Sequence, residues 1–273
     1  MKKKLALASS AAALLLLLAG CSKKGLTEHS SGLWNQIVYY FAVIIHWFSF
    51  NGPIAVGIIL FTLVLRTLLL PLMNLQIKSS QKMQELQPQV KAIQAKYPGK
   101  DMASRQAMQA EISQLQSENG ANPMMGCLPV LVQMPFLWAL YQALLNVNFA
   151  QMSHFQPHFL WFDTVTKDPT YVLPILAAIF TFGSSFLMMR GNPENNGMTT
   201  AMTAIMPIFI FFIAMNLSAG VALYWVVSNA YQVFQTLIIA NPWKLRAERA
   251  AKVQAEKDKE KARERALKKA TKK

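Results

Sequence analysis

Arg66 is the residue with the clearest chemical potential in this sequence. It is the one charge in an apolar run over about 53–73, which is long enough to cross a bilayer. A charge in the middle of such a run costs about 3 kcal/mol on insertion scales. Either the guanidinium reaches a lipid headgroup at the end of its flexible side chain, or it faces a water-filled cavity between helices. We favour the cavity.

Other polar residues lie in apolar runs and could share this cavity. Thr62 lies one helical turn before Arg66 and therefore on the same face. Gln133 is an amide within a second apolar run. Further polar side chains form a cluster and a stripe in later runs, and they are Thr181, Ser184, Ser185, Trp225, Ser228, Asn229, Gln232, Gln235 and Thr236. The alternative is that these groups only hydrogen-bond between helices, which explains about half of them but not Arg66.

Catalytic chemistry is not indicated. The membrane-spanning runs hold no His, Asp, Glu or Lys, so a serine–histidine pair or an aspartate pair cannot form there. Walker and dinucleotide-binding fingerprints are also missing from the sequence. His154, His158 and Asp163 could suggest a metal, but they lie in a loop without a further ligand cluster. We therefore predict a protein that is not an enzyme and that has no metal site and no cofactor.

The elements that position these residues are apolar helices. The chain has 273 residues, of which 53% are hydrophobic and 15% charged, and this composition predicts an all-α, polytopic membrane protein. Five spans are expected, at about 53–73, 126–147, 171–189, 200–216 and 220–240. The polar segment 74–122 has apolar positions at steps of three and four, interrupted at Pro98–Gly99. This pattern predicts a cytoplasmic hairpin of two antiparallel helices.

The N-terminal region resembles a lipoprotein signal. Residues 1–20 contain a basic start and an apolar stretch, and Leu18-Ala19-Gly20-Cys21 resembles the bacterial lipobox. This pattern implies cleavage before Cys21 and diacylglycerol on its thiol; the alternative is an ordinary signal peptide with a chance cysteine. Within 21–52, the polar residues 22–32 read as a flexible tether, and the aromatic run 33–50 predicts a helix lying at the outer membrane interface.

The distribution of charge indicates the orientation. The hairpin at 74–122 holds six Lys/Arg and the tail at 241–273 holds 13, whereas the predicted outer loops hold Lys167 alone. The positive-inside rule then places the N-terminus outside and the C-terminus in the cytoplasm, and a lipobox requires the same N-terminal side. The tail carries a net charge of +8, which favours an anionic partner, either lipid headgroups or RNA.

Two motifs resemble the YidC/Oxa/Alb family of membrane protein insertases. Arg66-Thr-Leu-Leu-Leu-Pro71-Leu, followed by Gln76-Ile-Lys78-Ser79, Met83, Leu86 and Pro88, is similar to the family's first span and hairpin. Asn122-Pro123-Met-Met-Gly126-Cys127-Leu128-Pro129-Val-Leu-Val-Gln133-Met-Pro135-Phe is similar to its second span. The resemblance covers about 33–240. The lipobox, and the lack of a large outer domain, resemble the Gram-positive lipoprotein-type YidC branch.

The resemblance implies five helices around a hydrophilic groove that is open to the cytoplasm and to lipid. The family's groove arginine falls on Arg66, and its polar partners fall on Gln133 and Trp225. From helical phase we assign four more residues to the groove, Thr62, Thr181, Ser184 and Gln232. The implied function is that of an insertase and chaperone, which moves short polar segments of nascent membrane proteins through the groove and releases their apolar helices into lipid.

The implied partners are nascent membrane proteins, the ribosome through the basic tail, and anionic lipids, but not DNA. Whether the chain works alone or beside a Sec translocon stays open on the sequence. Two other functions remain open on the sequence. A transporter or channel for a small anionic solute would predict an internal repeat or paired broken helices, and the sequence shows no repeat. The second open function is that of a structural lipoprotein or assembly scaffold.

Overall fold

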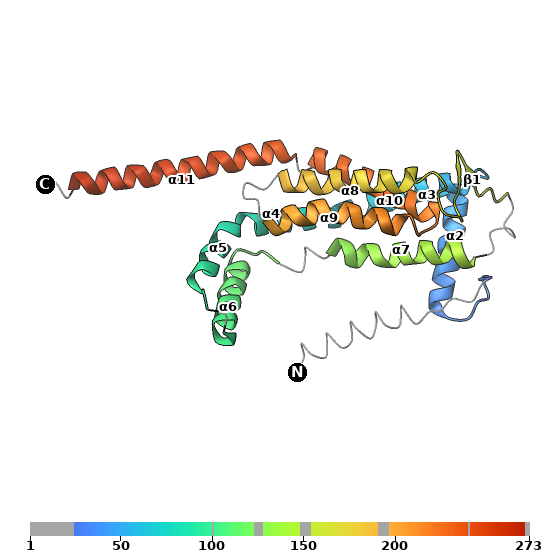
Figure 1. Cartoon of the computed structure of the whole chain (residues 1–273), viewed down its shortest axis with the longest axis horizontal. Coiled ribbons are helices and arrows are strands. Elements are labelled where there is room, and N and C mark those ends of the chain that lie inside the picture. Colours follow the sequence, from blue (N-terminus) through green and yellow to red (C-terminus); the bar gives the residue numbers. More distant parts are fainter. Residues whose placement is uncertain are drawn as a thin grey trace. The chain divides into compact units, whose positions relative to one another are not determined.

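The computed structural model of the chain is mostly helical (Figure 1). It describes residues 25–99, 101–122, 128–147, 154–190, 197–239 and 241–270. Cys21 and the rest of the predicted signal lie outside these residues. The described helices are α2 (Leu33–Phe48), α3 (Ile54–Leu68), α4 (Leu70–Glu85), α5 (Gln87–Lys96), α6 (Met102–Glu118), α7 (Leu128–Asn146), α8 (Val172–Arg190), α9 (Gly197–Ala214), α10 (Ala219–Ile239) and α11 (Pro242–Ala270).

The chain divides into two compact units, which we describe separately. The first comprises the described parts of 1–69, 129–177 and 210–228, and the second those of 70–128, 178–209 and 229–273. The first unit therefore holds α2, α3, α7 and the early turns of α10. The second holds α4, α5, α6, α9 in most of its length, the later turns of α10, and α11.

The predicted first span is a broken helix. Helix α3 ends at Leu68 and α4 begins at Leu70, and the two axes differ by 59°. Pro71 explains the break, because its nitrogen carries no hydrogen to donate to the carbonyl of Thr67 and its ring disfavours helical geometry at the residue before it. The predicted span over about 53–73 is thus bent at Leu69, and Arg66 lies in the last turn of α3.

The crossing of α2 and α3 forms the core of the first unit. The buried side chains at the crossing are Val38, Phe41, Ala42 and Ile45 on α2 and Ile54, Ala55 and Ile58 on α3. Gly57 allows the backbones to approach closely, since a Cβ atom there would lie 2.0 Å from the carbonyl oxygen of Ile45. Phe41 and Phe61 pack edge to face, with ring centroids 4.8 Å apart.

The loop before α8 contacts α3 and the start of α10. A pair of two-residue strands, β1 (His158–Phe159) and β2 (Phe162–Asp163), lies antiparallel within it. Thr164 is fully buried, and its carbonyl accepts a hydrogen bond of 2.9 Å from the amide of Gly220. A Cβ at Gly220 would lie 2.8 Å from Leu144 Cδ1 and 2.9 Å from the Thr164 oxygen, so α7, the loop and α10 meet closely there.

Asp168 joins this loop to the start of α8. Its carboxylate accepts hydrogen bonds from the amide of Leu173 at 2.7 Å and from the amide and hydroxyl of Thr170 at 3.0 and 2.8 Å. Burial raises the pKa of Asp168, but these hydrogen bonds favour the ionised form more strongly, and the pKa is lowered overall.

The predicted N-terminal tether is fixed at one point. The amides of Gly25 and Leu26 donate hydrogen bonds of 2.7 and 2.9 Å to the carbonyl of Asn146, at the end of α7. The side chain of Leu26 is buried. These contacts tie one point of the predicted tether to the end of α7.

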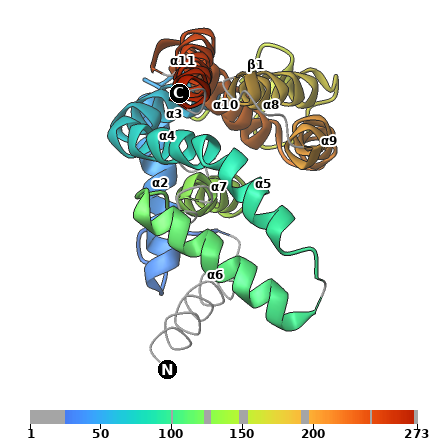
Figure 2. The same ribbon diagram turned by 90° about the vertical axis from the view of Figure 1, so that its left-hand side faces the viewer.

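The second unit contains the predicted hairpin. Helices α5 and α6 lie on either side of Pro98–Gly99, and the chain turns back between them (Figure 2). Asp101 caps α6 by accepting a hydrogen bond of 2.9 Å from the amide of Ser104. Lys96 of α5 pairs with Glu111 of α6 at 3.0 Å. The predicted two-helix hairpin over 74–122 contains three helices, because α4 continues from the bend and is separated from α5 at Leu86.

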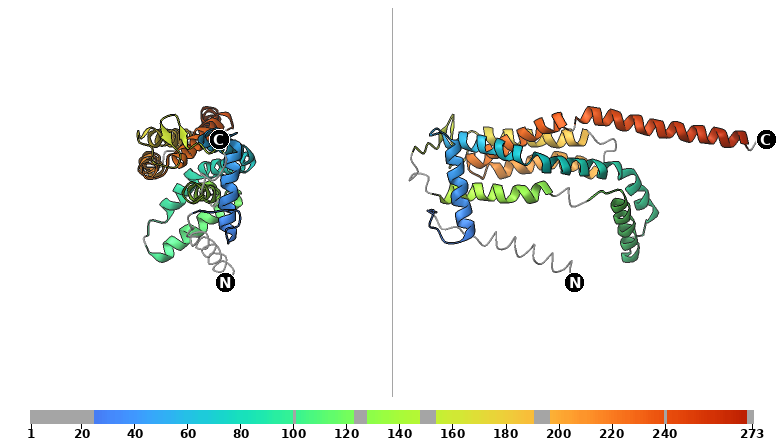
Figure 3. Two further views of the ribbon diagram at one scale, coloured as in Figure 1. Left: turned by 90° about the vertical axis from the view of Figure 1, so that its right-hand side faces the viewer. Right: turned by 180° about the vertical axis from the view of Figure 1, so that it is seen from behind.

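The basic tail is a long helix, α11, drawn in red in Figure 3. This helix was not predicted from the sequence. Its first turns pack on α4 through Arg249, a buried residue whose guanidinium contacts Gln81, Gln84 and Glu85.

Apolar side chains are exposed along several helices. They include Ile175, Ile179 and Phe182 on α8, Ile208, Phe209 and Phe212 on α9, and Phe234 and Ile238 on α10. Faces of this kind suit lipid better than water. Within the described residues, α8 is long and apolar enough to cross a membrane, and the bent pair α3–α4 passes the same test together. Helix α10 has 21 residues, but its Ser, Asn and Gln side chains lower its hydropathy.

Candidate functional site

Arg66 is held by a neutral hydroxyl group. Its Nε and Nη2 atoms donate hydrogen bonds of 2.8 and 2.5 Å to Ser228 Oγ. Ser228 is buried on α10. The position of Arg66 in the last turn of α3 also favours a cation, because the helix carbonyls give that end partial negative charge. The serine hydroxyl thus accepts two hydrogen bonds from the guanidinium, and the helix end favours its positive charge electrostatically.

A second polar contact lies on the same part of α10. The Nε2 atom of Gln133, on α7, donates a hydrogen bond to the hydroxyl of Tyr224. Tyr224 is buried, and it lies one helical turn before Ser228. The two hydroxyls therefore share one face of α10. Residues of α3, α7 and α10 therefore meet through polar groups in the first unit.

The structure brings some of the predicted site residues into this cluster and not others. Arg66 and Gln133 each hydrogen-bond to a residue of α10. Trp225 is the neighbour of Tyr224 and is half-buried. Thr62 is fully buried, and its hydroxyl donates to the carbonyl of Ile58 at 2.6 Å, so its polar group bonds within α3 itself.

The remaining predicted site residues belong to the second unit. Thr181 and Ser184 are buried on α8, and the Ser184 hydroxyl donates to the Thr181 carbonyl at 3.0 Å. Gln232 of α10 is half-buried, and its carbonyl accepts a hydrogen bond of 2.8 Å from the Thr236 hydroxyl. These contacts are internal to their helices.

Two residues of the cluster were not among the predicted site residues. Ser228 was part of the polar stripe on the last apolar run, but the partner of Arg66 could not be chosen from that stripe. Tyr224 immediately precedes the stripe and was not considered. The signal that could have found it is spacing, since a tyrosine four residues before a serine shares its helix face.

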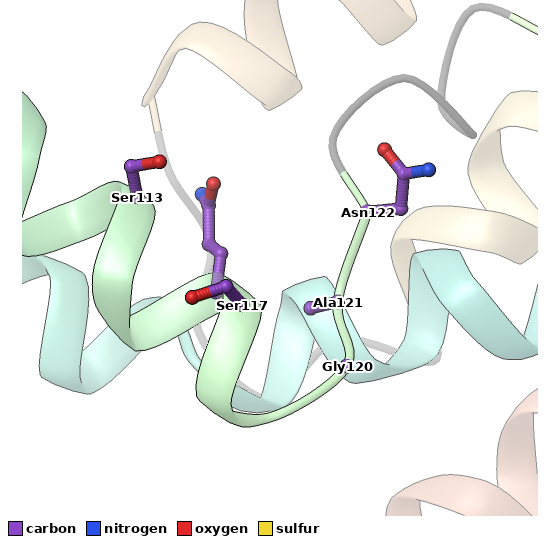
Figure 4. Close-up of a pocket in the computed structure, with 6 residues that line it drawn as sticks. Ser113, Ser117, Gly120, Ala121 and Asn122 are labelled. Carbon is purple, nitrogen blue, oxygen red and sulfur yellow. The ribbon is translucent and has the colours of Figure 1, made fainter.

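An open pocket of about 380 Å³ lies elsewhere, at the C-terminal end of α6 (Figure 4). Its lining residues are Ser113, Gln116, Ser117, Gly120, Ala121 and Asn122, which are small or polar and uncharged. It is a feature of the hairpin and does not include Arg66.

A family model now places this architecture among known proteins. The model described as 60Kd inner membrane protein matches residues 44–247, which include Arg66, Gln133, Tyr224 and Ser228. The chain belongs to this family. It is a membrane protein, as the composition predicts.

Similar proteins cover the whole chain. Membrane protein insertase YidC 1 of Lactococcus lactis is 62% identical over 273 residues, which are 100% of both chains. Membrane protein insertase YidC 1 of Streptococcus agalactiae is 46% identical over 273 residues, covering 100% of this chain and 99% of the relative. Membrane protein insertase YidC 2 of Streptococcus pneumoniae is 47% identical over 276 residues, with the same coverage. The prediction of the YidC family from the two motifs is confirmed.

A solved structure shares the fold. A crystal structure of an active YidC insertase with its first transmembrane domain resolved matches with a TM-score of 0.59 and 24% identity. The match covers 76% of this chain and 47% of the other, so this chain spans about half the length of that protein.

Proposed function

We propose that this chain is a membrane protein insertase and chaperone, which moves short polar segments of nascent membrane proteins partway through the bilayer. The observation that carries the proposal is the Arg66 guanidinium, held by the Ser228 hydroxyl at the end of an apolar helix. The similar proteins are named membrane protein insertases, which favours the same function over the alternative of a transporter or channel.

The groove would be formed by the polar faces of five spans. Arg66 supplies the positive charge, and we assign Gln133, Trp225, Thr181, Ser184 and Gln232 to its lining. Thr62 is buried, and its hydroxyl is already bonded to a backbone carbonyl. It would therefore support Arg66 from the buried side of α3 and would not itself bind substrate. Such a groove shortens the apolar distance that a polar segment must cross, and it binds acidic residues in transit, since charges attract more strongly at low dielectric.

Release would need no nucleotide. Once the polar segment has crossed, the apolar helix of the substrate leaves sideways along the third and fifth spans, α8 and α10, into lipid. The exposed apolar side chains of these helices support such a route. The hydrophobic effect then supplies the driving force, because the substrate helix leaves water for hydrocarbon.

The proposed topology has five spans, the N-terminus outside and the C-terminus in the cytoplasm, with lipid on Cys21. The uneven distribution of Lys and Arg supports this orientation. The α5–α6 hairpin would receive the substrate. The basic tail would hold the ribosome, whose RNA is polyanionic, or anionic lipid headgroups, and a Sec translocon is a further candidate partner.

The test is insertion by the purified full-length chain in lipid vesicles. Two single-span substrates should be compared, which differ only in an acidic or a neutral outer tail. Arg66→Ala should lower insertion of the acidic-tail substrate at least about tenfold, if one desolvated charge pair contributes about 1.4 kcal/mol or more. Arg66→Lys should retain most of the activity, because charge matters more here than bidentate geometry.

A matched control is Lys167→Ala, which removes one positive charge from an exposed position in the outer loop. It should leave insertion of both substrates unchanged. Normal insertion of the acidic-tail substrate by the Arg66→Ala variant would refute the groove mechanism. A flux of small anions through the same vesicles, abolished by Arg66→Ala, would favour the transporter instead.

A further inference from the structure

The turn between strands β1 and β2 presents apolar side chains on its surface. Leu160 and Trp161 connect the two strands, and their side chains are 65% and 39% exposed. Glycine and asparagine are the usual residues in such a turn, because tight hairpins need left-handed backbone geometry. Leu160 adopts this geometry, with a φ of 56°, although a bulky side chain disfavours it. An exposed leucine gains little from packing, so the fold itself gives no reason for a leucine here.

The base of this turn is well packed, and the exposed tip is therefore not part of a loose loop. Phe162 is 2% exposed and packs edge to face with Phe159, with ring centroids 5.9 Å apart. Thr164 is fully buried, and its amide and hydroxyl donate hydrogen bonds of 3.0 and 3.2 Å to the carbonyl of Pro157. The tip is thus held in place by its base.

The loop runs from this hairpin into α8, which is long and apolar enough to cross a membrane. Asp168 ties the two together by accepting a hydrogen bond of 2.7 Å from the amide of Leu173. Tyr171, the residue before α8, is 50% exposed, and the apolar Val172 and Ile175 that follow are exposed as well. Aromatic residues are enriched at the ends of membrane spans, at the level of the headgroups. The start of α8 therefore has the features of a membrane interface.

The other side of the hairpin is tied to the turn after α2, the helix predicted to lie at the membrane surface. The amide of Ile54 donates a hydrogen bond of 2.9 Å to the carbonyl of Gln156, and the Gln156 side chain donates one of 3.4 Å to the carbonyl of Asn51. Phe50, in the same turn, is 69% exposed and also left-handed, with a φ of 51°. Both attachments of the hairpin thus lead to segments that suit a membrane surface.

We propose that the Leu160–Trp161 turn inserts into the lipid leaflet at the start of α8, beside Tyr171. A leucine side chain that leaves water favours an apolar phase about tenfold to a hundredfold, which offsets the disfavoured backbone geometry. The polar pair His158 and Asp163, whose side chains lie 3.1 Å apart, flanks the hairpin at its base and remains accessible to water. The apolar surface of the tip continues that of α8, and this continuity favours lipid over a protein partner.

The inference goes beyond the proposed function. It depends on α8 crossing the membrane, and it does not depend on Arg66 or on any substrate. Lipid contact at this turn would fix the depth of a loop that also holds α10, since the carbonyls of Thr164 and Thr166 accept hydrogen bonds from the amides of Gly220 and Ala219.

The experiment measures the surroundings of single labelled cysteines in the full-length chain, in phosphatidylcholine and phosphatidylglycerol vesicles. Cys21 and Cys127, the two native cysteines, are replaced by serine. An environment-sensitive fluorophore is attached to Leu160→Cys, to Tyr171→Cys as the interface control, and to Lys167→Cys, an exposed position in the same loop, as the water control. Lipid brominated in its acyl chains should quench the label at 160 within about twofold of that at 171, since a tenfold preference keeps the tip in lipid about 90% of the time. Aqueous iodide should quench only the label at 167.

A second measurement needs no label and decides the question if Leu160→Cys does not fold. Brominated lipid quenches tryptophan, and the difference between the unmodified chain and Trp161→Phe gives the share of quenching that is due to Trp161. Leu160→Asn suits left-handed geometry and removes the apolar group. It should lower the Trp161 share at least about twofold, because the tip loses a tenfold or larger preference for lipid.

Quenching of the label at 160 by iodide and not by lipid would overturn the proposal, as would a Trp161 share of zero. Protection from both quenchers would mean that protein, such as a second copy of this chain, covers the tip, and would also overturn it. If the label at 171 were not quenched by lipid, α8 would not cross the membrane and the proposal would fail with it. Normal insertion by Arg66→Ala would refute the groove mechanism and leave this proposal standing.

Discussion

The guanidinium of Arg249 donates a hydrogen bond of 3.1 Å to the side-chain oxygen of Gln84, which joins the tail helix α11 to α4. A second hydrogen bond of 3.3 Å reaches the carbonyl of Gln81, and the carboxylate of Glu85 lies 3.7 Å from Nε. Burial lowers the pKa of Arg249, but an arginine remains charged at physiological pH. The partners on α4 therefore offset the cost of burying a charge.

Arg249→Ala should release the start of α11 from α4. Hydrogen bonds to a charged group contribute about 1.5–3 kcal/mol when buried, so the helix should open much more often. Amide hydrogen exchange over residues 242–250 is the measurement, and it should become faster in the variant. Arg246→Ala, at an exposed position on the same helix, should leave exchange unchanged. Equal exchange in all three proteins would show that Arg249 does not hold the tail.

Gly57→Ala should strongly destabilise the first unit. The added Cβ would lie 2.0 Å from the Ile45 carbonyl oxygen, so α2 and α3 would have to separate. Overpacking of this kind costs about 1–3 kcal/mol or more, and thermal unfolding in detergent should shift accordingly. Gly183→Ala is the matched control, because its Cβ would meet Val233 at an ordinary 3.6 Å. Alanine also favours a helix interior. A Gly57→Ala protein as stable as the control would contradict the close crossing.

Asp168 should make stability depend on pH. Its pKa is lowered in the folded protein, so the folded state prefers the ionised form. The resulting stability is present above the ordinary pKa of about 3.9 and is lost as pH falls through the lower, folded pKa. Asp168→Asn should destabilise the protein at pH 7 by about 1–3 kcal/mol, since an amide nitrogen cannot accept the same hydrogen bonds. The difference in melting temperature between the two proteins should shrink as pH is lowered from about 5 to 2; a constant difference would argue against ionisation as the cause.

Deletion of residues 244–273 should weaken binding to ribosomes. The whole tail from residue 241 carries a net charge of +8, and contacts with phosphate weaken steeply as salt rises. Co-sedimentation with ribosomes at low and at physiological salt is the measurement, and vesicles of anionic lipid provide the comparison. Retained ribosome binding with lost vesicle binding would identify headgroups as the partner of the tail.

The sequence was sufficient to predict the helices, because each apolar run is long and lies between polar segments. The expected runs correspond to α7, α8, α9 and α10 within a few residues. The break between α3 and α4 was not predicted, although a proline such as Pro71 inside an apolar run is a known signal for one. The helical tail was missed because its charges surround the helix and leave no apolar periodicity.

The site was predictable only in part. Arg66 and Gln133 were conspicuous, since a charge and an amide are rare in apolar runs. The partner of Arg66 was not, because several polar side chains share α10 and only packing selects Ser228. Arg249 was hidden for a similar reason. It is one of 27 Lys and Arg residues, and its burial depends on a contact with α4, which is 165 positions away in the chain.

The hydrogen bonds from Gly25 and Leu26 to Asn146 have a consequence for the acyl group proposed on Cys21. Only about four residues separate that cysteine from the fixed point, and an extended chain of this length reaches about 14 Å. The leaflet that receives the acyl chains must therefore lie within that radius of the end of α7. A lipid-modified N-terminus would therefore limit the distance between the Asn146 end of α7 and the lipid.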